Sequence, residues 1–201
     1  MLELILNIMN EKLINENLTV YMKDVDMLRN IIRYNTAPKN NQETVAEHSF
    51  YVAAYVLKLY EFYEFDLEKA LSLSLLHDFS EVYISDVPHP VKANNKALED
   101  AFESAEYEIN KEKLSETVAN WLVEFNNRTT AEGTICALAD ILSVISYSKN
   151  EINLGNKTYM AEVYKKTVKR IREIVKLSAK YLREGYTESD ILNSINDFKE
   201  I

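Results

Sequence analysis

Glycine and proline are scarce in this chain, which contains three of each among its 201 residues. An all-β fold needs these residues in its many tight turns, whereas a bundle of helices needs few chain breaks. The scarcity therefore favours helices. Hydrophobic residues make up 47% of the chain, an ordinary share for a globular protein and enough for a substantial core.

Apolar residues at helical spacing, together with capping signals, divide the chain into helices. Thr44 followed by Glu47 forms the clearest start signal, the capping-box pattern. We find no internal repeat and no linker long enough to separate domains, so the sequence predicts one all-α domain over residues 1–201. Its expected helices are an N-terminal amphipathic stretch and the ranges 25–34, 44–65, 66–84, 95–126, 130–149, 157–183 and 187–199.

The chain is acidic, with 32 Asp and Glu residues against 23 Lys and Arg residues and a net charge of −9. Affinity for nucleic acid depends on neutralising phosphates with basic side chains, so we expect no nucleic-acid partner. The single cysteine, Cys136, excludes an internal disulfide and fits a reducing cytoplasm. No apolar run reaches bilayer length, and the N-terminus lacks the basic region of a signal peptide, so we expect a cytoplasmic protein without a membrane partner.

All three histidines of the chain lie between residues 48 and 89. His48 and His77 fall in apolar helices, where a lone histidine is often a core residue bonded to a backbone carbonyl. Asp78 follows His77 directly, and a buried carboxylate needs a cation, a metal or several donors. Asp140 lies among apolar neighbours in another helix, where a solvent-facing position is the alternative.

Two histidines and two aspartates from three apolar helices would form a site with two nitrogen and two oxygen ligands. Such a site suits one divalent transition metal per chain, namely Mn, Co, Fe, Ni or Zn. Four protein ligands leave positions open for water and substrate, which is the arrangement of a catalytic metal site.

The order His48, His77-Asp78 and Asp140 resembles the H…HD…D signature of the HD-domain metal-dependent phosphohydrolases. The segments "ETVAEHSFYVA", "LLHDFSEVYISDVPHPVK" and "ALADIL" are similar to those of the bacterial 5'-deoxynucleotidase branch. The similarity covers residues 25 to about 150, and helices within 157–199 would complete the bundle. The resemblance implies a single HD-domain helical bundle that is usually a homodimer.

The resemblance also implies an activity, the removal of the 5'-phosphate from deoxyribonucleoside 5'-monophosphates by attack of a metal-bound water. His48, His77, Asp78 and Asp140 would hold the metal, and Asp78 is also expected to be essential for catalysis. Glu81 would act as a general acid or base. If the expected helix 66–84 continues through Glu81, this residue faces the same side as the ligands.

Four further residues take substrate-binding roles from the resemblance. Arg33 would meet the phosphate, and Asp86 the sugar. Tyr34 stands where the family has a tryptophan that crowds the 2'-position and excludes ribose. His89 in "VPHPVK" stands where relatives have a small polar residue, near the base or sugar.

Two other functions remain open from the sequence. A deoxynucleoside triphosphate triphosphohydrolase of the same superfamily would need more basic residues near the motif than Arg33 alone. The alternative of another class is a non-catalytic helical module that uses the metal for stability or binds a partner through the Lys/Arg-rich helix 157–183. The presence of Glu81 and Arg33 beside four ligands favours an enzyme.

Overall fold

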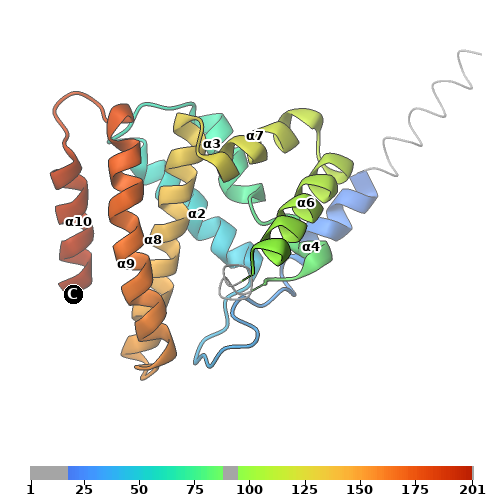
Figure 1. The fold of residues 1–201 in the computed structure, drawn as a ribbon, viewed down its shortest axis with the longest axis horizontal. Coiled ribbons are helices and arrows are strands. Elements are labelled where there is room, and N and C mark those ends of the chain that lie inside the picture. The colour runs from blue at the N-terminus through green and yellow to red at the C-terminus, as the bar shows by residue number, and fades with distance from the viewer. Residues whose placement is uncertain (1–17, 88–94, 201) are drawn as a thin grey trace, which may run out of the picture.

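Helices form the whole framework around the candidate site (Figure 1). The computed structural model describes residues 18–87 and 95–200, so the expected N-terminal helix lies mostly outside the described residues. After a helix at residues 18–27, its elements are α2 (Val45–Leu59), α3 (Leu67–Leu76), α4 (Glu81–Ile84), α6 (Lys96–Lys113), α7 (Glu116–Asn127), α8 (Ala131–Asn153), α9 (Tyr159–Ser178), the short 3-10 helix η1 (Ala179–Tyr181) and α10 (Glu188–Glu200). Within the described ranges we find isolated β-bridges but no strand, which confirms the all-α prediction.

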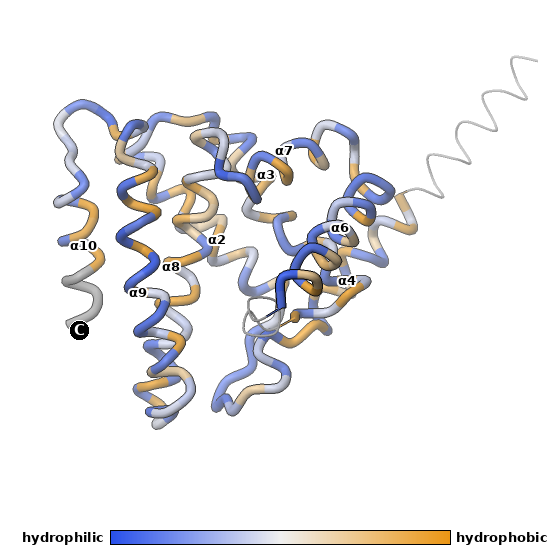
Figure 2. The backbone as a smooth tube through the Cα atoms, in the orientation of Figure 1, coloured by the Kyte–Doolittle hydropathy of each residue, from blue (hydrophilic) through white to orange (hydrophobic). Residues whose placement is uncertain are grey.

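Helix α8 is the central element of the bundle. It packs against α9 on one side and against α2, α3 and α7 on the other, while α10 covers α9 (Figure 1). Its side chains Ile135, Leu138 and Ile145 are fully buried in the main hydrophobic core. Figure 2 shows hydrophilic and hydrophobic stretches alternating along α9, as expected of a helix with one face on a core.

The predicted capping signals are confirmed at the start of α2. The Thr44 side chain accepts a hydrogen bond from the Glu47 backbone N–H, and the Glu47 carboxylate accepts one from the Thr44 backbone N–H. This reciprocal pair satisfies two of the N–H groups that a helix start leaves unbonded. It fixes the first turn of α2 and therefore the place of His48 one residue later.

The expected helix 66–84 is wrong, because α3 ends at Leu76 and α4 begins only at Glu81. The His77 ring nitrogen Nδ1 lies 3.0 Å from the Ser74 carbonyl oxygen, a group near the helix end that needs a partner. Beyond it the chain tightens into turns, in which the Phe79 N–H donates to the Leu76 carbonyl. The histidine and aspartate of the motif therefore lie at a helix end.

Other expected ranges also differ from the structure, and 44–65 is one of them, since α2 ends at Leu59. The range 95–126 is two helices, since Ser115 caps the start of α7 through the N–H of Val118. In place of a helix over 25–34, the helix ends at residue 27 and the chain turns. The Val45 N–H donates to the Ile31 carbonyl, so this segment bonds to the start of α2 rather than to itself.

Gly133 allows α8 to cross α7 at close range. A Cβ atom at this position would lie 2.8 Å from the Glu124 carbonyl oxygen and 3.0 Å from the Phe125 Cα. The Phe125 ring in turn contacts His77, with 5.5 Å between ring centroids. The crossing therefore sets the distance between α7 and the candidate site.

We predict that Gly133→Ala lowers the free energy of unfolding by about 1–3 kcal/mol, because the added methyl group meets rigid backbone. Urea unfolding measures this change. The opposite result, a gain of up to about 1 kcal/mol, is what helix propensity alone would give. Such a gain would contradict the close crossing.

Among the described residues, none of the helices is by itself long and apolar enough to cross a membrane. Helices α7 and α8 meet that length and composition criterion only jointly, as a pair bent by 66°.

Candidate metal centre

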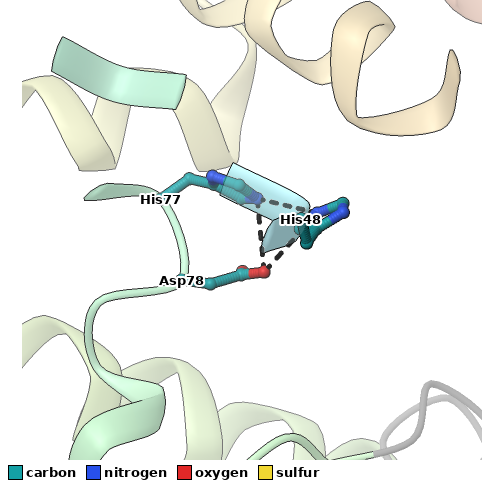
Figure 3. Close-up of side chains that lie close together, drawn as sticks. All are labelled: His48, His77 and Asp78. Atoms are coloured by element: carbon teal, nitrogen blue, oxygen red, sulfur yellow. Dashed lines mark hydrogen bonds and ion pairs between the residues drawn. The ribbon is translucent and has the colours of Figure 1, made fainter. Parts of the chain in front are cut away.

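His48, His77 and Asp78 bring their side chains together at one point (Figure 3). His48 comes from α2, and the other two follow the end of α3. The two Nε2 atoms lie 3.3 Å apart, and the Asp78 Oδ2 atom lies 3.2 Å from His77 Nε2 and 3.8 Å from His48 Nε2. These three residues form a group that can hold a metal ion.

Asp140 approaches the same point from α8. Its Oδ1 atom lies 3.2 Å from His48 Nε2, although it lies outside the tight group of three. His48 is fully buried, while the Asp140 side chain is 27% exposed. The structure thus brings together all four residues that the sequence suggested as ligands, and the carboxylates lie on the more open side.

Each histidine ring is oriented by a contact at Nδ1, the ring nitrogen that faces away from the other histidine. A carbonyl oxygen can only accept, so His77 Nδ1, 3.0 Å from the Ser74 carbonyl, carries a proton. In the neutral ring, His77 Nε2 is then the atom with a free lone pair. His48 Nδ1 lies 3.1 Å from the Ser143 hydroxyl. Outer contacts of this kind fix ring orientation in metal sites.

The spacing of these atoms fits a metal ion. Ligands placed about 2.0–2.2 Å from a tetrahedral ion lie roughly 3.3–3.6 Å from one another. The observed separations among the His48, His77, Asp78 and Asp140 atoms include values of 3.2 and 3.3 Å. Two imidazoles and two carboxylates also match the preference of divalent transition metals. The residues therefore fit the metal that the motif implies.

The electrostatics of the group favour metal binding at His48 and Asp78. Burial, followed by the nearby charge of Arg33, lowers the pKa of His48 to about 4, so its ring is neutral near pH 7. Burial alone would raise the pKa of Asp78, but His77 and Arg33 outweigh it and hold that pKa well below its usual range. Burial alone would lower the pKa of His77, but Asp78 raises it, so metal binding there competes with a proton.

The Arg33 side chain is mostly buried beside the group of His48, His77 and Asp78. Its Nη1 atom donates to Asp78 Oδ2 at 2.9 Å, and its Nε atom lies 3.3 Å from Glu43 Oε2. The Arg33 side chain is 11% exposed and that of Glu43 is 7% exposed. Burial raises the pKa of Glu43 to about 7, although Arg33 opposes this effect. Arg33 therefore orients the candidate ligand Asp78.

Tyr34 adopts a left-handed backbone conformation with φ of 53°, which an aromatic residue rarely takes. Two contacts hold it there. Its backbone N–H donates to Asp86 Oδ2 at 2.8 Å, and its ring stacks on Tyr147 with 5.3 Å between centroids and 3° between planes. The structure thus joins Asp86, a candidate sugar contact, to the segment that carries Arg33 and Tyr34.

Of the two remaining predicted site residues, the structure describes Glu81 but not His89. Glu81 is buried, with 9% of its surface exposed, at the first residue of α4, and its charge acts on Arg33. It reaches this place through the turn after α3, not through the continuous helix that we expected. His89 lies outside the described residues.

Sequence reasoning missed Ser143 and Glu43, which contact the predicted site residues His48 and Arg33. Ser143 lies three residues after Asp140, so it shares a helix face with it, and this spacing was a usable signal. Glu43 lies directly before the capping box of α2 and carried no signal of its own. Its role becomes visible only when the fold brings Arg33 against it.

Comparison with known proteins agrees with this fold. A crystal structure of a protein from Pyrococcus horikoshii OT3 matches with a TM-score of 0.71 and 24% identity, covering 88% of this chain and 97% of that one. An HD-domain phosphohydrolase from Listeria innocua matches with a TM-score of 0.65 and 25% identity, covering 80% and 83%. Fold and motif together define an HD-domain metal-dependent phosphohydrolase.

The family can be stated more narrowly. The family model described as 5'-deoxynucleotidase YfbR-like matches residues 20–189, so the chain belongs to that family. A 5'-deoxynucleotidase from Pasteurella multocida is 27% identical over 150 residues, which are 68% of this chain and 76% of the relative. The expected resemblance to this branch is confirmed.

Proposed function

We propose that the chain is a metal-dependent 5'-deoxynucleotidase, which converts deoxyribonucleoside 5'-monophosphates to deoxynucleosides and phosphate. The observation that carries the proposal is the convergence of His48, His77, Asp78 and Asp140 in a member of this family. In the proposal these four residues hold one divalent transition metal per chain, chosen from Mn, Co, Fe, Ni and Zn.

When bound, such a metal lowers the pKa of a coordinated water to near 7 and offsets phosphate charge. The chain's residues supply the remaining functions. Arg33 has five N–H donors, and its contacts with Asp78 and Glu43 leave donors to bind the phosphate. Glu81, buried at the start of α4, moves a proton to or from the reacting oxygen. Asp78 keeps Arg33 beside the ligand set.

The sugar would lie between two elements that the structure joins. Asp86, whose Oδ2 atom accepts the Tyr34 N–H, would contact a sugar hydroxyl. The Tyr34 ring, fixed by its stack on Tyr147, would take the place beside the 2'-position. His89 completes the proposed base or sugar contact. Discrimination against ribose would then come from a rigid aromatic ring.

We also propose where the enzyme acts and how it assembles. We expect a single-domain protein that acts in the cytoplasm on free nucleotides rather than on nucleic acid, which agrees with a net charge of −9. We also expect a homodimer. Helix α2 supports this expectation because it exposes Phe50, Tyr51 and Leu57, whose exposed fractions are 65%, 50% and 53%.

Product analysis on a panel of dNMPs, NMPs and dNTPs tests the proposal, with Mn, Co, Fe, Ni, Zn or Mg added in turn. We expect inorganic phosphate from dNMPs and much slower release from NMPs. Equal rates on NMPs would show that Tyr34 does not exclude ribose. Triphosphate from dNTPs would identify a triphosphohydrolase instead, and no product from a metal-loaded chain would leave only the binding module.

A further inference from the structure

Residues 33–43 form a closed loop beside the metal centre, which we call the strap. Its two ends are tied together, since the Arg33 backbone N–H donates to the Glu43 carbonyl at 2.8 Å and Ile32 forms a β-bridge with Thr44. The strap carries three residues of the site: Arg33 and Tyr34 at one end and Glu43 at the other. Its position therefore decides where these side chains lie.

The tip of the strap is held by Glu151, near the end of α8. This carboxylate is fully buried, with 0% of its residue surface exposed. Its Oε2 atom accepts the Asn40 backbone N–H and its Oε1 atom accepts the Asn41 backbone N–H, both at 2.7 Å. Hydrogen bonds to a charged acceptor are among the stronger ones in proteins. Each carboxylate oxygen accepts one of these two backbone N–H groups. A buried carboxylate thus holds two successive exposed residues at the tip of the strap.

Two neighbours of Glu151 hold the strap at further points. The Asn156 side-chain amide donates to the Pro38 carbonyl at 2.7 Å and to Glu151 Oε2 at 3.3 Å. The Tyr147 hydroxyl donates to the Asn41 carbonyl at 2.7 Å, and the ring of the same residue stacks on Tyr34. The tip of the strap and its Tyr34 end are therefore fixed by one surface of α8.

That surface belongs to the helix that also carries Asp140. Positions 140, 143, 147 and 151 follow one another at three- or four-residue intervals, so they lie along one side of α8. The same side of one rigid helix thus presents Asp140 and Ser143 to the metal centre and Tyr147 and Glu151 to the strap. The helix sets the strap at a fixed place relative to the candidate ligands.

We propose that Glu151 is a positioning residue for substrate binding: it locks the strap onto α8 so that Arg33 and Tyr34 meet the nucleotide in a fixed arrangement. This inference rests on the proposed function, in which those two residues contact the substrate. Glu151 itself touches no reacting atom. Its effect passes through the backbone of Asn40 and Asn41.

The substitution Glu151→Gln tests the inference in the full-length, metal-loaded protein. A glutamine has one acceptor oxygen and turns an NH₂ group toward the second backbone N–H, so one tie is lost. We expect KM for a dNMP to rise at least about tenfold, while kcat changes by less than about threefold, because the ligands are anchored on other elements. Hydrogen exchange at the Asn40 and Asn41 amides should become faster.

Ser148→Ala is the matched control. Ser148 is equally buried on α8, but its hydroxyl donates to the Val144 carbonyl of its own helix at 2.7 Å. We expect its KM to stay at the wild-type value. If Glu151→Gln fails to fold, Tyr147→Phe replaces it, since that variant keeps the ring and loses the hydroxyl bond to Asn41. Its KM should rise about threefold, the cost of one neutral hydrogen bond.

The outcomes separate the two claims. A wild-type protein that hydrolyses no dNMP overturns the proposed function and this inference with it. An active wild type with an unchanged KM in folded Glu151→Gln, or with a loss in kcat alone, overturns only the role of Glu151. If Glu151→Gln does not fold, an unchanged KM in Tyr147→Phe also overturns the role of Glu151.

Discussion

Asp78→Ala is expected to reduce metal-dependent phosphate release from a dNMP by more than about 100-fold, beyond the 10–100-fold typical of losing an outer contact of a metal site. The Asp78 Oδ2 atom lies 3.2 Å from His77 Nε2, 3.8 Å from His48 Nε2 and 2.9 Å from Arg33 Nη1. The variant therefore loses a candidate ligand and also the partner that orients Arg33. Initial rates at saturating metal, with metal affinity measured separately, check the prediction.

Asp100→Ala is a suitable control for this experiment. Asp100 is 59% exposed on α6, where it pairs with Lys96. An exposed pair of this kind contributes little to stability, so we expect rates within about twofold of wild type. An Asp78→Ala protein that kept a tenth or more of the wild-type rate would contradict the assignment of Asp78 as a ligand.

Glu81→Gln is expected to lower kcat by about 10²–10⁴-fold, the usual contribution of a general acid or base. Glutamine has nearly the same shape as glutamate but cannot take up and release a proton. Because Glu81 is not among the four candidate ligands, the metal content of the folded variant should equal that of the wild type. Rate measurements paired with metal analysis check both halves of the prediction.

This pairing separates two explanations for a loss of rate. A slow Glu81→Gln enzyme with a full complement of metal supports proton transfer by Glu81. A slow variant that has lost its metal would mean that Glu81 holds the site together instead. A variant with wild-type kcat would remove Glu81 from the mechanism.

The sequence predicted the four candidate ligands because their identities carry the signal. His48 follows a capping box that fixes the start of its helix, and His77-Asp78 is an unusual pair at the end of an apolar run. A local rule thus predicted where the helix that carries His48 begins. The structure then brings them together as the spacing of the motif suggested.

The end of α3 could not be predicted in the same way. Residues 66–84 have continuous helical periodicity, but the His77 ring bonds back to the Ser74 carbonyl and the chain turns. The break serves the site, since it places Asp78 beside His77 and begins α4 at Glu81. Local propensity does not include this contribution from side-chain geometry.

Sequence reasoning also could not predict contacts between segments that lie far apart in the chain. Glu151 lies in the polar segment "SKNEINLGN", which looks like an ordinary solvated helix end. Its carboxylate is satisfied mainly by hydrogen bonds to residues 110 and 111 positions earlier in the chain, together with one from Asn156. The pairing of Glu43 with Arg33 is hidden in the same way.

Metal titration of the chelator-treated protein tests the central claim most directly. Mn or Co is added stepwise to the apoprotein, and phosphate release from a dNMP is measured at each step. The account predicts no release without metal and a rate that rises to a plateau at one equivalent per chain. Release that is independent of added metal, or its absence at every level of bound metal, would contradict the account.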